Sequence, residues 1–109
     1  MAQRKHKYGA KPVVIDNIRF ASTAEGNRYL ELKLMKQAGL IEDLQLQPRF
    51  QLRVNDVLIT TYIADFRYKD RETGEWVVED VKGVLTDVYK IKRKLMQVLH
   101  GIEIREVRA

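Results

Sequence analysis

The sequence predicts a single α/β domain whose core runs helix, three strands, helix, strand, with a central mixed sheet flanked by helices. Two segments combine helical spacing of apolar residues with capping residues at their ends, 22–39 and 86–101. Three segments between them are β-branched, aromatic or alternating, and a short one ends the chain: 44–54, 57–68, 76–83 and 102–107. Because the middle strands carry apolar residues on both faces, we expect both faces to be covered.

The first helix is marked by its own ends. A hairpin with a turn at Asp16 and Asn17, types that tolerate positive φ, precedes it. Ser22 can cap the helix, and Glu25 follows at the spacing of a capping box, in which its carboxylate reaches back to the backbone N–H of the cap. Gly39 can end the helix.

The strands follow in order. Segment 44–54 alternates polar and apolar residues, and Pro48 stands near its start. Asn55 and Asp56 indicate a turn, after which segment 57–68 is rich in β-branched and aromatic residues. A polar turn then leads to the third strand, so we expect neighbouring strands to form antiparallel hairpins.

The second helix has one apolar and one basic face. Thr86 can cap it and Gly101 can end it. The apolar residues share one face, which we expect to be buried: Val88, Ile91, Leu95, Val98 and Leu99. The opposite face carries Lys90, Arg93 and Lys94.

Composition describes an ordinary globular protein. The chain has 109 residues, 45% hydrophobic and 32% charged, which suits one domain with a modest core. It has no cysteine, so disulfides and thiolate metal sites are excluded and a cytoplasmic location is permitted. No apolar run reaches the roughly 20 residues of a membrane span. We expect no membrane partner and no signal peptide.

The net charge of +5 is unevenly distributed. Residues 1–12 contain no acid and are expected to form a basic, flexible arm ahead of a single domain at 13–109. The basic residues that could contact a polyanion lie in this arm and on the second helix: Arg4, Lys5, Lys7, Lys90, Lys92, Arg93 and Lys94. The other interpretation is a solvated tail and a solvated helix face, and charge alone favours neither.

The segment VVEDVKG at 77–83 places three charges in a strand that is otherwise apolar. Burying a charge is costly unless the charge is paired or holds a metal. Side chains alternate across a strand, so Asp80 and Lys82 share one face and Glu79 points to the other. Glu79 is therefore expected to be a solvated or paired strand residue rather than a ligand.

Asp65 on the preceding strand adds a third charge. With a hairpin centred on Thr73 and Gly74, Asp65 lies directly opposite Lys82 and one diagonal step from Asp80. Two neighbouring aspartates become compatible if a hard divalent cation such as Mg²⁺ lies between them. Such a metal lowers the pKa of a bound water, and the lysine can orient that water. The alternative is a structural ion pair between the lysine and one aspartate.

These residues resemble a known nuclease pattern. An Asp on one strand followed by Asp-x-Lys on the next is similar to the PD-(D/E)XK nuclease superfamily, here as Asp65 and Asp80-Val81-Lys82. Six segments in order resemble a family of small phage and prophage proteins, long of unknown function, that is grouped with these nucleases: FASTAEGNRYLELKLMKQAGLI, LQLQPRF, TYIADFRY, VVEDVKG, TDVYKIKRKLM and GIEIREV. This resemblance covers nearly the whole chain from about Tyr8.

The resemblance implies a restriction-endonuclease-like core and cleavage of DNA with Mg²⁺ or Mn²⁺. By position, Asp65 and Asp80 would hold the metal, Lys82 would orient the attacking water, and Glu25 would complete the metal shell. Glu25 can equally serve only as a helix cap, and Lys92 can either cover the core with its stem or reach a phosphate. Ala64 replaces the proline of the superfamily's name, and an Asp stands at position 80 where many members have Glu.

The expected function is a metal-dependent endonuclease for branched DNA, such as four-way (Holliday) junctions formed in phage recombination or replication. It would act as a homodimer, since two symmetric cuts need two sites, in the host cytoplasm if the protein is phage-encoded. The alternatives are a non-catalytic DNA-binding module and an accessory recombination protein that acts through a protein partner.

Overall fold

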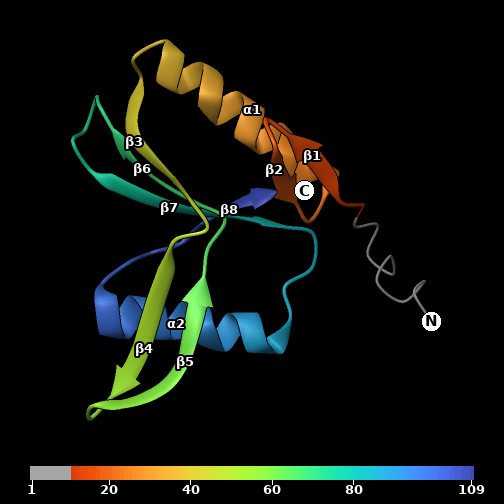
Figure 1. Cartoon of the computed structure of the whole chain (residues 1–109). Helices are drawn as coiled ribbons and strands as arrows, with labels where there is room; N and C mark the ends of the chain where they lie inside the picture. The colour runs from red at the N-terminus through yellow and green to blue at the C-terminus, as the bar shows by residue number, and fades with distance from the viewer. Residues whose placement is uncertain (1–10) are drawn as a thin grey trace.

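A computed structural model of the chain describes residues 11–109 and shows an α/β domain with a mixed sheet and two helices (Figure 1). The elements in chain order are β1 (Val13–Ile15), β2 (Ile18–Phe20), α1 (Thr23–Gln37), β3 (Ile41–Leu46), β4 (Arg49–Val54), β5 (Val57–Ile63), β6 (Phe66–Asp70), β7 (Trp76–Lys82), α2 (Asp87–His100) and β8 (Arg105–Arg108). None of the helices described is long and apolar enough to cross a membrane.

Four strands form the central sheet in the order β3-β6-β7-β8. β7 and β8 run parallel and the other pairs run antiparallel, which confirms the expected mixed sheet. The β1–β2 and β4–β5 hairpins are separate two-stranded sheets. α1 and the β1–β2 hairpin lie toward one end of the molecule, and α2 lies behind the β4–β5 hairpin at the other (Figure 1).

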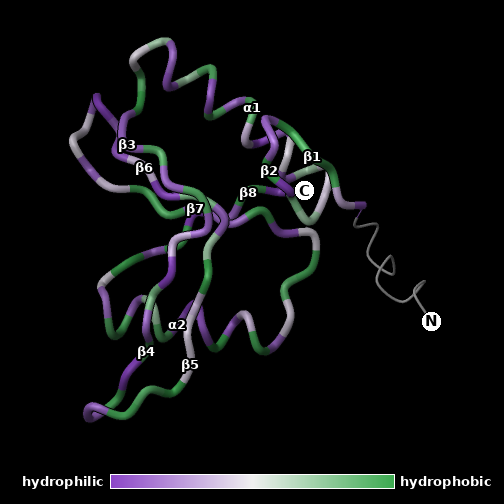
Figure 2. The backbone as a smooth tube through the Cα atoms, in the orientation of Figure 1, coloured by the Kyte–Doolittle hydropathy of each residue, from purple (hydrophilic) through white to green (hydrophobic). Residues whose placement is uncertain are grey.

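Each face of the central sheet packs against its own cluster of buried apolar residues. Apolar residues lie on both helices and along the strands of every sheet (Figure 2). The cluster under α1 contains Phe20, Tyr29, Leu32, Ile41, Phe66 and Tyr68. The cluster under α2 contains Leu52, Tyr62, Ala64, Val78, Tyr89, Met96 and Ile104. Coverage of both faces, as the apolar pattern predicted, places β7 between the two clusters with side chains in each.

The predicted helix starts at Ser22 and Thr86 and the predicted helix end at Gly101 are confirmed. The Ser22 hydroxyl accepts the backbone N–H of Glu25 at 3.1 Å, and the Thr86 hydroxyl accepts that of Tyr89 at 3.1 Å. Gly101 ends α2 in the left-handed conformation with φ 66°. Capping satisfies backbone N–H groups that have no partner within the helix, so these short polar residues fix where each helix begins.

The prediction of one strand at 44–54 and another at 57–68 is wrong, because each segment is divided between two shorter strands. The breaks face each other: Gln47 N donates to Asp65 O at 2.9 Å, and Ala64 N donates to Pro48 O at 3.1 Å. Pro48 has no N–H for a ladder, and Gln47 has a positive φ of 52°. We call this pair of breaks the joint. Beyond it, β4 and β5 leave the central sheet and pack against α2.

The predicted register between the second and third strands is also wrong, by two residues. Phe66 pairs with Glu79, so Asp65 lies nearest Asp80 and not Lys82. Its backbone N–H donates to the carbonyl of Glu79 at 3.1 Å. A shift of two preserves the alternation of faces, so the prediction that Asp65 and Asp80 share a face holds.

The turn between β6 and β7 explains this shift. The Asp70 carboxylate accepts the backbone N–H groups of Glu72 at 2.8 Å and Thr73 at 3.3 Å. Gly74 follows with φ 76°. An aspartate that bonds its own downstream backbone starts the turn at its own position. The turn is therefore centred one residue earlier than Thr73-Gly74.

The final strand begins later than predicted. The sequence predicts a strand at 102–107, whereas β8 starts at Arg105 and runs to Arg108. Its parallel pairing places Glu106 beside Asp80 in register. The residues that precede it serve the core, since Ile104 is buried under α2.

The predicted buried face of α2 is wrong in part. Val88, Ile91 and Val98 are 62%, 61% and 72% exposed, while Tyr89 and Met96 supply the buried contact. The β4–β5 hairpin crosses α2 instead of running along it (Figure 1), so it covers only part of the helix surface. One apolar flank of α2 is left facing solvent.

Candidate functional site

The candidate site lies where β7, the joint and the first turn of α1 meet. β7 contributes Asp80 and Lys82, the joint contributes Asp65, and α1 contributes Glu25. Asp65, Asp80 and Lys82 all act on the ionisation of Glu25, which shows that the four groups share one electrostatic environment. The structure thus brings together the four residues that the sequence predicted to be catalytic.

The two aspartates are held by hydrogen bonds from neighbouring elements. Asp65 Oδ2 accepts the backbone N–H of Val81 at 2.7 Å. Asp80 is 3% exposed, and its Oδ2 accepts the Tyr62 hydroxyl and lies 3.5 Å from Lys82 Nζ. Both carboxylates are therefore oriented before any ligand arrives.

Burial and neighbouring carboxylates raise the pKa values of Asp65 and Glu25. Burial raises the pKa of Asp65 well above its usual range, and hydrogen bonding to Asp80 and the charge of Asp80 raise it further. Burial also raises the pKa of Glu25, followed by the charge of Asp80, although hydrogen bonding to the backbone at Ala21 and the charge of Lys82 oppose this. Carboxylates that disfavour each other's ionisation are stabilised by a cation or a shared proton.

Lys82 is placed by α2. Its ammonium lies 4.0 Å from the centroid of the Tyr89 ring, within cation–π range. The Tyr89 hydroxyl donates to Glu106 Oε2 at 2.8 Å, which fixes the ring. The lysine side chain is 25% exposed, so its head can reach both Asp80 and a solvent-borne ligand.

Lys82 lines three grooves, and Thr86 lines two of them with it. The larger of these two, of about 540 Å³, runs between the start of α1, including Glu25, and the segment after β7. The smaller, of about 280 Å³, lies between the end of β5 and the start of α2 and includes Lys92. Lys82 and Thr86 line both, so an extended ligand could pass across the lysine from one groove to the other.

The fit to a metal rests on the two aspartates. Within residues 11–109, no group of three or more acidic, histidine or cysteine side chains is arranged as a complete metal site. Asp65 and Asp80 nevertheless offer a pair of hard oxygen donors on one face, with Glu25 nearby. Mg²⁺ retains several waters and is commonly held by one or two carboxylates, so this donor set suits Mg²⁺ or Mn²⁺.

Glu79, on the other face of β7, is paired, as predicted, and is completely buried. Its carboxylate accepts Arg28 Nε at 2.8 Å and Nη2 at 2.7 Å, a two-pronged pair, and also accepts the Tyr68 hydroxyl. Arg105 Nη1 lies 3.9 Å away. This network ties α1 to β7, and Glu25 lies one turn before Arg28.

Sequence reasoning missed three residues that support the site: Arg28, Tyr62 and Tyr89. Arg28 could have been found from its spacing, since it lies three residues after Glu25 on the same helix face. The two tyrosines gave no signal, because a buried aromatic residue is usually part of the core and its hydroxyl partner depends on tertiary contacts.

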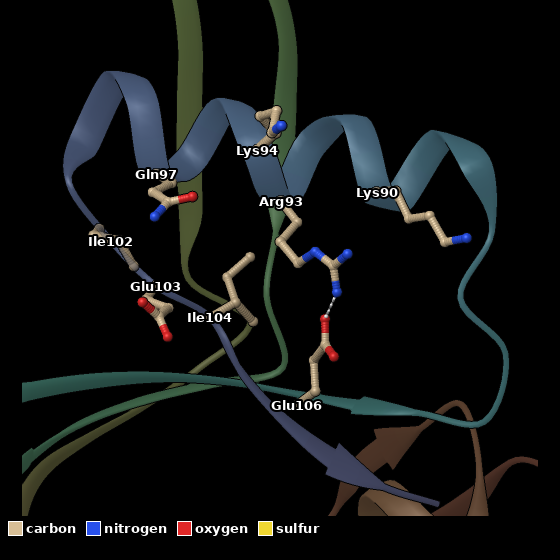
Figure 3. Close-up of a pocket in the computed structure, with 8 residues that line it drawn as sticks. All are labelled: Lys90, Arg93, Lys94, Gln97, Ile102, Glu103, Ile104 and Glu106. Carbon is tan, nitrogen blue, oxygen red and sulfur yellow. Dashed lines mark hydrogen bonds and ion pairs between the residues drawn. The ribbon is translucent and has the colours of Figure 1, made fainter.

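The basic residues of α2 divide into two sets. Arg93 Nη1 pairs with Glu106 Oε2 at 2.6 Å and is therefore engaged within the protein (Figure 3). Lys90 and Lys94 are exposed and line the same pocket, whereas Lys92 is half-buried and lines the smaller groove beside Lys82. Lys90, Lys92 and Lys94 are thus the residues of this helix best placed for a phosphate backbone.

The other basic residues predicted to contact DNA, Arg4, Lys5 and Lys7, lie outside the described residues. The same holds for most of the predicted arm at 1–12. Lys11, at its end, is exposed. The role of this arm stays a prediction.

Comparison with known families gives one match. The profile of a family described as "Protein of unknown function (DUF1064)" matches residues 5–108. The chain belongs to this family. Comparison with curated proteins gives no match, and neither does comparison with solved structures. The match includes α1, the joint, β7 and α2.

Proposed function

We propose that this DUF1064 protein is a divalent-metal-dependent endonuclease that hydrolyses phosphodiester bonds in branched DNA. One observation carries the proposal: Asp65 of the joint and Asp80 of β7 meet on one face of the sheet, with Lys82 against Asp80, beside two grooves. A surplus of carboxylates beside a lysine, one buried and two half-buried, is an arrangement that metal-dependent phosphoryl chemistry uses.

Each residue has a role that its contacts support. Asp65 and Asp80 would hold Mg²⁺ or Mn²⁺, whose chemistry is to acidify a water and stabilise charge on the phosphate. Tyr62 and the backbone of Val81 hold the aspartates in place. Lys82 would orient the water and offset negative charge as the phosphate is attacked.

Glu25 would complete the metal shell, directly or through water. Its helix-cap position and its position beside Asp80 are compatible, because its backbone N–H bonds the Ser22 hydroxyl while its carboxylate lies toward the aspartates. The order α1, β3, β6, β7, α2, β8 of the central sheet and its helices agrees with a restriction-endonuclease-like core, which we propose as the fold family. The resemblance to small phage proteins supports four-way junctions as substrates and the host cytoplasm as location.

A second candidate function is a non-catalytic DNA-binding or accessory recombination protein. Two observations favour it: the ion pair between Asp80 and Lys82, and the lack of a complete three-ligand cluster among residues 11–109. In that case the buried charges would serve the fold alone. The basic residues of α2 would bind DNA through its phosphates with little sequence preference.

Cleavage of a panel of labelled linear, flap, fork and four-way DNAs, with Mg²⁺ and with EDTA, separates these candidates. The nuclease cuts branched DNA with Mg²⁺ and stops in EDTA. Asp80→Asn abolishes cutting but leaves DNA binding intact or tighter, because one negative charge near the phosphate is removed. A Lys69→Gln variant, which changes an exposed pair with Glu42, serves as control and cuts as the parent does.

Two results would contradict the proposal. The first is metal-independent binding with a steep salt dependence and no product on any DNA, which identifies a binding module. The second is an Asp80→Asn variant that cuts as fast as the parent, which removes the site assignment even if the protein is a nuclease.

A further inference from the structure

The exposed flank of α2 is apolar along its length. Val88, Ile91 and Val98 are each more than half exposed, and Leu95 between them is half-buried. The spacing of these four residues is three, four and three, which is the a/d spacing of a helix that packs along another helix. Within residues 11–109, Leu95 packs partly against the cluster under α2, whereas Val88, Ile91 and Val98 belong to neither apolar cluster. A solvated helix would carry polar residues at these positions.

The neighbouring strand β5 extends this surface. β5 pairs with β4 on one side, and within the described residues its other edge has no partner. Its sequence, VLITTYI, has no charge and no proline, two of the features by which edge strands avoid association. Ile63 at its end lines the same groove as Val88, so the strand and the helix flank adjoin.

The chemistry of this surface indicates what covers it. It contains no charged side chain, although 32% of the chain is charged, so it does not suit a phosphate backbone. Lysines border it, with Lys92 toward the groove beside Lys82 and Lys94 toward the pocket under β8. A second copy presents the same apolar stripe with no unpaired charge at its centre, which is the condition for a two-fold contact.

The size of the surface predicts a weak contact. A 14-residue helix is about 21 Å long and 10 Å wide, and a seven-residue strand is about 23 Å long. Together they give a footprint of about 400 Å² per copy, within the range of the largest apolar patches on proteins and about half the standard interface of roughly 800 Å² per partner. Association should therefore depend on concentration.

We propose that the apolar flank of α2, together with the adjoining edge of β5, is the contact between two copies of this chain. The inference goes beyond the proposed function, because it is argued only from the exposure of these side chains, from their spacing along α2 and from the charges around them. Hydrophobic contact strengthens with kosmotropic salts such as sulfate, and salt also screens the bordering lysines. The dimer therefore tightens as the concentration of such a salt rises, whereas DNA binding weakens.

Because the chain has no cysteine, single-cysteine variants test the contact directly. Under oxidation at micromolar concentration, Ile91→Cys forms a covalent dimer at least tenfold faster than Leu34→Cys, a matched residue on α1 that is 66% exposed. In sedimentation velocity the parent associates reversibly, and Ile91→Glu stays monomeric with an unchanged melting temperature. Leu34→Glu associates as the parent does.

Equal cross-linking rates for the two cysteine variants would overturn the proposal. So would a parent that stays monomeric at every concentration and salt tested, whether alone or with four-way DNA. The outcome is independent of catalysis. If the protein dimerises through this surface but cuts no DNA, only the nuclease proposal is rejected. If the protein cuts DNA but stays monomeric, only the proposed dimer contact is rejected.

Discussion

Glu79 and Asp80 are adjacent in β7, both are buried, and their surroundings differ completely. Glu79 meets Arg28 through two hydrogen bonds, with Arg105 and the Tyr68 hydroxyl nearby. Asp80 meets one lysine and one hydroxyl, together with the carboxyl group of Asp65. One face of the strand has enough positive charge for its carboxylate, and the other has too little.

This difference separates charge that is fully paired within the fold from charge that leaves room for a cation. A buried carboxylate with a complete set of partners has no further ligand to accept, and its network specifies how α1 docks on the sheet. Clustered carboxylates with an incomplete set are a cost to the fold that a bound cation would offset. Substitutions on the two faces should therefore fail in different ways.

The largest expected effects come from a matched pair of amide substitutions. Asp65→Asn lowers the single-turnover cleavage rate by about a thousandfold, with an unchanged or higher free energy of unfolding because it relieves repulsion at the site. Glu79→Gln lowers the free energy of unfolding by about 3 kcal/mol, because it leaves Arg28 without its buried partner. Denaturant unfolding and rapid-quench cleavage on the same preparations measure both quantities.

Similar behaviour of Asp65→Asn and Glu79→Gln would contradict the distinction between the two faces of β7. Loss of stability in Asp65→Asn equal to that in Glu79→Gln would show that both faces are structural. Arg28→Lys is the companion control: it keeps the charge but loses the two-pronged geometry, so it should be less destabilising than Glu79→Gln.

The next effect is a pH dependence in EDTA. The pKa of Asp65 is raised in the folded protein, so between its ordinary value and the raised one the folded state binds more protons than the unfolded state. The free energy of unfolding therefore falls as pH rises through that window. Chemical denaturation at a series of pH values measures this slope, Asp65→Asn flattens it, and Mg²⁺ opposes it by binding the folded state. A parent whose stability rises across the window would contradict the pKa shift.

The smallest effect concerns the support of Lys82. Tyr89→Leu removes the ring beneath the ammonium and lowers the cleavage rate roughly threefold to tenfold, the value of a partly exposed cation–π contact. Tyr89→Phe keeps the ring but loses the hydrogen bond to Glu106, so cleavage is retained while stability falls by about 1 kcal/mol. Metal-titrated cleavage curves measure both variants. An equal loss of cleavage rate in Tyr89→Phe and Tyr89→Leu would show that the ring does not position Lys82.

Local chemistry made most of the elements predictable. The caps at Ser22, Thr86 and Gly101 act within three or four residues, and the turn residues Asp16 and Asn17 adopt the positive φ values expected of them. The grouping of Asp65 with Asp80 was predictable because alternation of faces survives a register shift of two. These predictions needed no knowledge of tertiary structure.

The errors arose where tertiary contacts decide the outcome. An alternating pattern runs through the joint without interruption, so only the turn away from the central sheet reveals that Pro48 ends one strand and begins another. The apolar residues along α2 predict that this helix face is covered, but they do not identify the segment that covers it. Arg28 was missed because its partner, Glu79, lies 51 positions away in sequence.

The joint also has a mechanical consequence. The residue that carries one proposed metal ligand belongs to neither ladder, and two backbone hydrogen bonds, to Gln47 and Glu79, hold its peptide between them. The β4–β5 hairpin extends about 20 Å from this point. Because β4 and β5 also pack against α2 through Leu52 and Tyr62, this peptide links the seating of the hairpin on α2 to the position of the Asp65 carboxylate.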